Sequence, residues 1–183
     1  MIVIVGESAS GKTSVAKYLM DHYGYKRIIT FTTRSPRENE KDGVDYYFVD
    51  QKRFNTLLSD GYFAENAVYN DWYYGSAKDD YKNDTVAVLT PKGLRSIKKN
   101  GVKNIFSVYL TVPRRDRLIK CLERGDNIEE AYRRNLSDVG QFDGIEDEVN
   151  LVLENPKYSY SIEYIADFIA SCDFTTGVKH ERV

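Results

Sequence analysis

Cysteine and histidine are scarce in this 183-residue chain, which contains two of each. Cys121 and Cys172 are too few for a disulfide framework and form no Cys-x-x-Cys pair, so we expect a reducing compartment and a cytoplasmic protein. The two histidines, His22 and His180, have no metal-ligand spacing, which argues against a zinc site or a histidine-dependent catalytic triad.

The chain also lacks an excess of charge of either sign and any long apolar run. Its formal net charge is −2, which argues against a general binder of nucleic acids or membrane surfaces. No apolar stretch approaches the length that spans a membrane. The remaining composition, 42% hydrophobic and 30% charged residues, is typical of a soluble globular protein, and the length fits a single domain with inserted parts.

What the sequence does contain is a phosphate-binding motif near its start. Residues 2–5 form an apolar, β-branched run with the character of a buried strand, and residues 13–22 carry apolar side chains at helical spacing. Between them lies Gly6-Glu7-Ser8-Ala9-Ser10-Gly11-Lys12-Thr13. A strand, a loop bounded by glycines and a Lys-Thr pair that opens a helix are the context of a P-loop.

This loop predicts the binding of nucleotide phosphates. Two glycines let the loop wrap tightly, so that backbone N–H groups and the helix N-terminus point at one anion. Lys12 then reaches the β- and γ-phosphates, and the Thr13 hydroxyl is left for Mg²⁺. The phosphate-binding residues that we expect are Gly6, Ser8, Ala9, Ser10, Gly11, Lys12, Thr13 and Ser14. The alternative is a simple glycine turn, which requires four fixed positions to match by chance.

Beyond the loop, strands and helices alternate in the second half of the chain. Strands are predicted at residues 28–31, 85–89, 105–110 and 151–153, and helices at 113–123, 126–138 and 158–169. A further helix is predicted to begin with Thr90 as N-cap and Pro91 as its first residue. In the helix over 113–123, Leu118, Ile119 and Leu122 share one side. Such alternation predicts an α/β fold, a P-loop NTPase-type parallel sheet with helices on both faces.

The tyrosine-rich stretch 35–80 breaks this alternation. Strands at residues 46–49 and 62–69 and a short helix between them predict a separate, partly antiparallel lobe that binds a second substrate. Guanidinium groups suit bidentate contact with phosphate oxygens, and phenolic hydroxyls donate further hydrogen bonds. Arg34, Arg37 and the tyrosines near them are therefore candidates for holding a phosphate. The alternative is that the arginines are solvated and that the tyrosines pack within the sheet.

Glu65 is an acidic residue inside an apolar, strand-like stretch. A buried carboxylate needs hydrogen-bond donors. Guanine offers two adjacent donors, the N1–H and the 2-amino group, whereas adenine has no N1–H. Glu65 is therefore a candidate for reading a guanine base, and a purely structural role stays open on these residues alone.

Three segments of the lobe closely resemble the GMP-binding lobe of the guanylate kinase family. They are Thr32-Thr33-Arg34-Ser35-Pro36-Arg37, Gly43-Val44-Asp45-Tyr46-Tyr47-Phe48-Val49 and Tyr73-Tyr74-Gly75-Ser76. The family has Thr-Thr-Arg-x-Pro-Arg, Gly-x-x-Tyr-x-Phe-Val and Asn-Tyr-Tyr-Gly segments at matching spacing, and its P-loop lies at the same place. The resemblance covers residues 1 to about 170. It implies phosphoryl transfer from ATP to GMP or dGMP, with Mg²⁺ and with no nucleic acid or membrane partner.

The resemblance also implies a division of the chain and roles for its residues. A single domain would have a core of residues 1–33, 84–112 and 148–183, an inserted monophosphate-binding lobe of mixed β/α structure at 34–83, and a helical lid at 113–147. The GMP-binding residues implied are Arg34, Arg37, Tyr46 and Tyr74 for the phosphate and Glu65, Thr30 and Ser76 for the base, to which we add Thr90 as a candidate. The catalytic residues implied are Lys12, Arg124 and one of Arg133 and Arg134, and Asn155 lies on the adenine side. For the lid, the alternative is that these arginines, with Arg114, Arg115 and Arg117, form a solvated charged face.

Three departures from the family pattern bear on substrate choice and rate. Val88 and Thr90 stand where the family has an Asp-x-Asp pair, one carboxylate of which serves the metal's water shell and the other the guanine side. Thr90 is left either to bond the base or to cap a helix. Lys120 replaces a lid arginine and so loses bidentate geometry. The stretch between Arg124 and Arg133 is also about one residue shorter than usual.

Other functions remain to be weighed against a guanylate kinase. A divergent monophosphate kinase with an altered base preference is favoured by the loss of the two aspartates. A non-catalytic module that binds protein partners usually has a degraded P-loop, whereas Gly11, Lys12 and Thr13 are all present here. A P-loop switch that hydrolyses ATP or GTP would leave the acceptor lobe without a purpose. Monomer and homodimer are both open.

Overall fold

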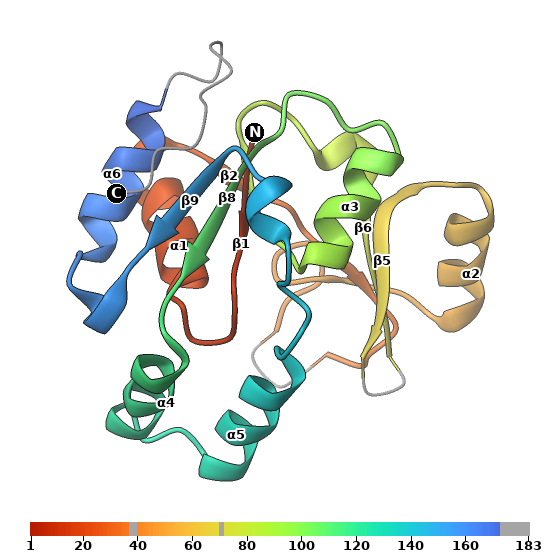
Figure 1. Ribbon diagram of the computed structural model, residues 1–183. Helices are drawn as coiled ribbons and strands as arrows, with labels where there is room; N and C mark the ends of the chain where they lie inside the picture. The colour runs from red at the N-terminus through yellow and green to blue at the C-terminus, as the bar shows by residue number, and fades with distance from the viewer. Residues whose placement is uncertain (37–39, 70–71, 173–183) are drawn as a thin grey trace.

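Two β-sheets organise the chain in the computed structural model, which describes residues 1–36, 40–69 and 72–172 (Figure 1). The strands of the first sheet are β1 (Ile2–Val5), β2 (Lys26–Arg27), β7 (Thr85–Val88), β8 (Phe106–Thr111) and β9 (Leu151–Glu154). Those of the second are β3 (Phe31–Thr32), β4 (Tyr47–Phe48), β5 (Phe63–Tyr69) and β6 (Trp72–Ala77). The helices are α1 (Lys12–Tyr23), α2 (Gln51–Ser59), α3 (Pro91–Lys99), α4 (Arg114–Glu123), α5 (Ile128–Ser137) and α6 (Ile162–Ser171).

The first sheet is parallel throughout, with the strand order β2-β7-β1-β8-β9. Alternate residues of β1 face opposite sides of this sheet. Ile2 and Ile4 pack with α1 and α6, whereas Val3 and Val5 pack with α3. All four side chains are buried because helices cover both faces, as a parallel sheet requires. The predicted fold class is therefore confirmed.

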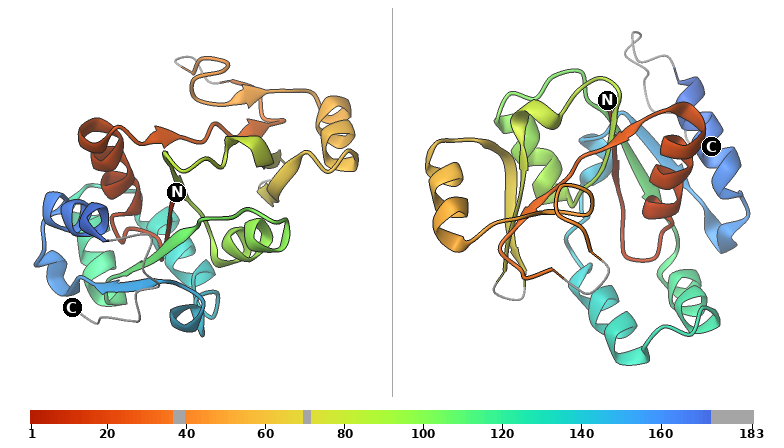
Figure 2. Two further views of the ribbon diagram at one scale, coloured as in Figure 1. Left: turned by 90° about the horizontal axis from the view of Figure 1, so that it is seen from above. Right: turned by 180° about the vertical axis from the view of Figure 1, so that it is seen from behind.

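The second sheet has the order β4-β3-β6-β5 and mixes antiparallel and parallel pairs. Helix α2 covers it with Phe54 and Leu57, which pack on Phe63 of β5. Helix α3 connects the two sheets, because Ser96 and Asn100 both donate hydrogen bonds to the Ala64 carbonyl oxygen. In both views of Figure 2 this sheet and α2 lie at the opposite end of the molecule from α6.

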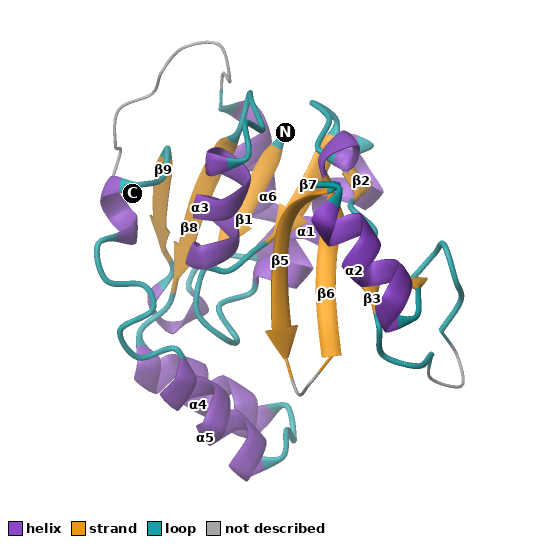
Figure 3. Cartoon of the chain, turned by 90° about the vertical axis from the view of Figure 1, so that its right-hand side faces the viewer, coloured by secondary structure: helices purple, strands orange, loops and turns teal. Residues whose placement is uncertain are grey.

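Helices α4 and α5 form a pair beyond the carboxyl ends of the first sheet (Figure 3). Helix α4 follows β8 almost directly, and the P-loop follows β1 at the same edge, so that the pair faces the P-loop. Ligands of open parallel sheets bind at this edge. Within the described ranges, no helix is both long enough and apolar enough to cross a membrane.

Two predicted elements differ in the structure. The strand expected at 28–31 is wrong, since residues 28–30 cross from β2 in the first sheet to β3 in the second. Ile28 is apolar because it is buried where the sheets meet, not because it pairs in a strand. The last helix begins at Ile162 rather than near 158, because the Ser161 side chain caps it by accepting a hydrogen bond from the Tyr164 N–H. Strand β6 was not predicted.

Candidate active site

The P-loop has the tight backbone that its two glycines permit. A side chain at Gly6 would place its Cβ 2.1 Å from the Leu110 carbonyl oxygen of the neighbouring strand β8. Gly11 has a φ of 99° and is the N-cap of α1. Only glycine adopts this conformation without strain. Both residues therefore hold the loop against the sheet and aim the start of α1 at its centre.

Lys12 folds back over this loop. Its Nζ donates hydrogen bonds to the Glu7 carbonyl oxygen at 2.6 Å and to the Ser10 Oγ at 3.5 Å. Burial lowers the pKa of Lys12 to about 8, and the carboxylates of Asp138 and Glu7 oppose that fall. Ser10 is buried, whereas Thr13 and Ser14 are exposed in the first turn of α1. The loop thus presents a cation and two hydroxyls at a helix N-terminus, which is an anion-binding arrangement.

One residue of the P-loop, Ser8, is held by α4 and by Asp138, which directly follows α5. The Asp138 Oδ2 accepts a hydrogen bond from the Ser8 N–H at 2.8 Å, and Arg117 of α4 donates one to the Ser8 carbonyl oxygen at 3.1 Å. Arg117 also donates to the Val112 carbonyl oxygen and to the Asn135 Oδ1, and its Nη1 lies 3.4 Å from the Asp138 Oδ2. Only 5% of Arg117 is exposed. For this arginine, the solvated-face alternative is wrong.

The inward face of α4 consequently differs from the one the sequence suggested. Arg117 and Cys121 point inward, while Ile119 and Leu122 are 43% and 55% exposed. Apolar spacing alone misplaced this face, because the burial of a guanidinium depends on partners elsewhere in the chain, such as Asp138 after the end of α5. Arg117 and Asp138 are functional candidates that sequence reasoning missed.

A pocket of about 280 Å³ lies between the P-loop and the two lid helices. Its lining includes Ser8, Ala9, Arg124 and Arg134. Arg124 is paired with the Asp126 carboxylate, and its side chain is 55% exposed. Arg133 is exposed and is not part of this lining. The structure thus brings Arg124 and Arg134 to the phosphate loop and does not bring Arg133 there.

A second pocket, of about 400 Å³, opens from the other side of the loop, between α1, β7 and the end of β6. Its polar lining includes Thr13, Thr30, Ser76 and Tyr81, and apolar side chains such as Val88 line the rest. Thr13 therefore stands at one end of a pocket whose other end reaches the second sheet.

The Glu65 carboxylate is hydrogen-bonded behind this second pocket. The Ser76 Oγ donates to its Oε1, and the Tyr81 hydroxyl lies 2.9 Å from the same Ser76 Oγ. Burial raises the pKa of Glu65, and the hydrogen bonds from Ser76 oppose that rise. Tyr81 is another residue that the sequence analysis did not single out.

The predicted phosphate-holding residues of the second sheet also lie together. The Arg34 guanidinium carbon lies 5.4 Å from the centre of the Tyr46 ring, whose centre is 6.2 Å from that of Tyr74. Both Arg34 Nη2 contacts are with the Glu40 carboxylate, at 2.7 and 2.8 Å. Arg37, predicted beside them, lies outside the described residues.

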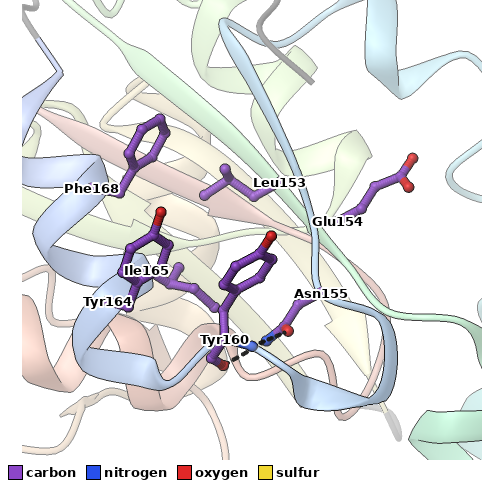
Figure 4. Close-up of a pocket in the computed structure, with 7 residues that line it drawn as sticks. All are labelled: Leu153, Glu154, Asn155, Tyr160, Tyr164, Ile165 and Phe168. Atoms are coloured by element: carbon purple, nitrogen blue, oxygen red, sulfur yellow. Dashed lines mark hydrogen bonds between the residues drawn. The ribbon is translucent and has the colours of Figure 1, made fainter. Parts of the chain in front are cut away.

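Asn155 and Thr90 have local partners. Figure 4 shows a small, mostly apolar pocket of about 20 Å³, in which both ends of the Asn155 amide bond the backbone of Tyr160. Asn155 is 2% exposed, so its role at an adenine stays a prediction. The Thr90 Oγ1 accepts a hydrogen bond from the Gly93 N–H at 3.1 Å and caps α3, as predicted.

A P-loop that only hydrolyses a nucleotide needs no second ligand. Here, however, the pocket that begins at Thr13 provides room for one, and the half-buried Glu65 carboxylate bonds Ser76 in its lining. This arrangement defines a P-loop phosphotransferase, an enzyme that moves a phosphoryl group between two bound molecules. The family model for guanylate kinase matches residues 1–172, and the chain belongs to the guanylate kinase family. The family resemblance seen in the sequence is confirmed.

Individual relatives agree with this assignment. A guanylate kinase of Rickettsia bellii is 31% identical in an alignment that covers 92% of this chain and 92% of the relative. A guanylate kinase of Prochlorococcus marinus is 32% identical in an alignment that covers 93% of this chain and 97% of the relative. A solved guanylate kinase from Anaplasma phagocytophilum matches with a TM-score of 0.63 and 24% identity, over 93% of this chain and 81% of that one, which shows the shared fold.

Proposed function

We propose that this enzyme transfers the γ-phosphoryl group of ATP to GMP or dGMP and releases ADP and the corresponding diphosphate. The observation that carries this assignment is Glu65. Its half-buried carboxylate bonds Ser76, which lines a pocket that reaches from the P-loop to the second sheet. An ionised carboxylate accepts hydrogen bonds and so matches the adjacent N1–H and 2-amino donors of guanine. Adenine lacks the N1–H.

On the donor side, the P-loop binds the ATP phosphates, and Lys12 contacts the phosphoryl group that is transferred. Arg124 and Arg134 line the pocket above the loop and neutralise charge as the phosphoryl group moves. From the family resemblance alone, we propose that Arg133 contacts the transferred phosphoryl group and that Asn155 lies beside the adenine. Because phosphoryl transfer needs little covalent chemistry from the protein, positioning and charge neutralisation are the main work of these residues.

On the acceptor side, the monophosphate lies on Arg34, Tyr46 and Tyr74, which the structure brings together, with Arg37 as a further contact. The base lies against Glu65, with Thr30 and Ser76 from the pocket lining and with Thr90. We propose that residues 34–83 swing as an acceptor lobe and that residues 113–147 close as a lid, which excludes water from the transfer. The low cysteine content supports a cytoplasmic location.

We also propose Mg²⁺ as the cofactor. The Thr13 hydroxyl is exposed at the mouth of the pocket, where it fits as a single protein ligand. Among the described residues, no group of three or more His, Cys, Asp or Glu could hold a metal ion. Mg²⁺ commonly keeps several waters and takes its other ligands from substrate phosphates, so this sparse donor set suits it. When bound, the ion neutralises charge on the β- and γ-phosphates.

A panel of acceptors tests the proposed function. We expect ADP release with GMP and dGMP to exceed that with AMP, CMP, UMP and dTMP by about 10⁴-fold, because a site built to bond a base rejects one that leaves its polar groups unpaired. A coupled ADP-release assay measures the rates. Activity spread over several bases would instead establish a divergent kinase, which Val88 in the pocket lining favours. No activity with any acceptor, with ATP still bound, would indicate a binding module.

The pH dependence of GMP binding tests the role of Glu65. Because burial raises its pKa above the ordinary value, Glu65 takes up a proton at a pH where an ordinary glutamate is still ionised. We expect the KM for GMP to rise as the pH falls from 7 to 5, since a protonated Glu65 accepts fewer hydrogen bonds. Glu65→Gln should raise the KM at pH 7.5 by about 10- to 100-fold, the effect of losing hydrogen bonds to a charged group.

The same variant provides the control for this experiment. The phosphate group of GMP also titrates near pH 6 and contributes its own pH dependence. Glu65→Gln retains that contribution and loses the contribution of the carboxyl group. A KM that changes with pH equally in both proteins would show that Glu65 does not bind the base.

A further inference from the structure

Tyr81 places a hydroxyl group beside Ser76 in the lining of the second pocket. It follows the short 3₁₀ turn of Lys78–Asp80, and its ring packs against the core cluster on the α3 side of the first sheet. The ring is therefore held by packing on one side while its hydroxyl lies 2.9 Å from the Ser76 Oγ. Both residues line the second pocket.

The hydrogen bonds of Ser76 fix which group donates to which. A serine hydroxyl has one proton, and that of Ser76 is donated to the Glu65 Oε1. The remaining contact, between Ser76 and Tyr81, therefore has the tyrosine as donor. Burial raises the pKa of Tyr81 above its usual value, so this donor proton is present at any pH near neutrality. The chain of donors runs from Tyr81 through Ser76 to Glu65.

At the end of β7, the two side chains at the positions of the family's Asp-x-Asp pair form no hydrogen bond with Ser76 in the described structure. Val88 lines the pocket without a polar side-chain atom. The Thr90 hydroxyl accepts a hydrogen bond from the Gly93 N–H at the start of α3. Tyr81 is thus the side chain whose hydroxyl determines the direction in which Ser76 donates.

We propose that Tyr81 is a specificity-determining residue, which makes Ser76 a hydrogen-bond donor to the acceptor base and thereby favours a 6-oxo purine over a 6-amino purine. This inference rests on the proposed function. With Tyr81 donating to its oxygen, Ser76 offers its proton to Glu65 or to a carbonyl oxygen on the base. A 6-amino group needs an acceptor instead, and it competes with the Tyr81 hydroxyl for the lone pairs of the serine oxygen.

Tyr81→Phe removes the hydroxyl and retains the packed ring. We expect kcat/KM for GMP to fall about 3- to 10-fold, the usual effect of one neutral hydrogen bond, while kcat/KM for AMP stays level or rises. IMP has the 6-oxo group without the 2-amino group, so its kcat/KM should fall by the same factor as that of GMP. Tyr23→Phe is the matched control, because its exposed hydroxyl bonds Asp167 on α6 and should leave all three values unchanged.

The ratio of GMP to AMP decides the outcome. An unchanged ratio in Tyr81→Phe would overturn the proposal, and so would an equal loss for all three purines, which indicates a packing role alone. The wild-type rate with GMP tests the proposed function separately. If the wild type transfers no phosphate, calorimetry can measure the dissociation constants of GMP and AMP for the wild type and for Tyr81→Phe. The ratio of the two constants is then compared between the proteins, which tests Tyr81 directly.

Discussion

Replacing Lys12 with methionine should lower kcat for GMP phosphorylation by about 10³-fold, the effect of removing one group that stabilises transition-state charge. Methionine retains most of the aliphatic side chain and loses the ammonium group, which in the free enzyme lies over the Glu7 carbonyl oxygen and the Ser10 hydroxyl. Initial rates at saturating GMP, with ADP release as the readout, measure the loss. Thermal unfolding should change little, since Lys12 forms no ion pair with any residue that the structure describes.

Lys52→Met is a suitable control, because Lys52 is exposed on α2 and far from the P-loop. It should retain the wild-type rate. The pH profile of the wild type adds an independent readout. Since burial lowers the pKa of Lys12 to about 8, its charged form is lost as the pH rises through that value, and kcat/KM for ATP should fall above pH 8. A Lys12→Met enzyme with more than a tenth of the wild-type kcat would remove Lys12 from the catalytic residues.

Arg117→Met should lower the free energy of unfolding by about 3–5 kcal/mol, because breaking a buried ion pair leaves the other charge uncompensated. The side chains of Arg117 and Asp138 are only 6% and 14% exposed. The variant also leaves the Asn135 Oδ1 and the Ser8 carbonyl oxygen without this donor. Urea unfolding followed by circular dichroism measures the change.

The exposed pair of Arg95 and Glu148 is the matched control, since its side chains are 49% and 34% exposed. Arg95→Met should cost no more than about 1 kcal/mol, as surface ion pairs do. Adding Asp138→Asn to Arg117→Met should restore part of the stability, because the stranded carboxylate is then neutral. Similar effects of Arg117→Met and Arg95→Met would show that the lid contact does not stabilise the fold.

The structural features that were predicted correctly from the sequence depend on residues close together in the chain. The strand at 2–5, the P-loop and the Thr90 cap are local patterns, and each lies in the structure where the pattern indicated. The parallel sheet followed because alternating strands and helices have few other arrangements.

What the sequence did not predict depends on residues far apart in the chain. Ile28 has the apolar character of a strand because two sheets meet at it, and the inward turn of Arg117 needs Asp138 and the Ser8 carbonyl oxygen. The grouping of Arg34, Tyr46 and Tyr74 came from the family resemblance, since their spacing along the chain does not by itself bring them together. Tyr81 left no signal among fifteen tyrosines, because its importance lies in a single contact with Ser76.

Two hydrogen bonds to Ser8 link two equilibria. Asp138 accepts one from the N–H of this residue and Arg117 donates one to its carbonyl oxygen, so the P-loop and the α4–α5 pair share a joint. If phosphates in the loop change the position of the lid by some free energy, then lid position changes the affinity for those phosphates by the same amount. A lid closed over the acceptor would therefore retain the donor nucleotide more tightly, and the order in which the two products leave would depend on this joint.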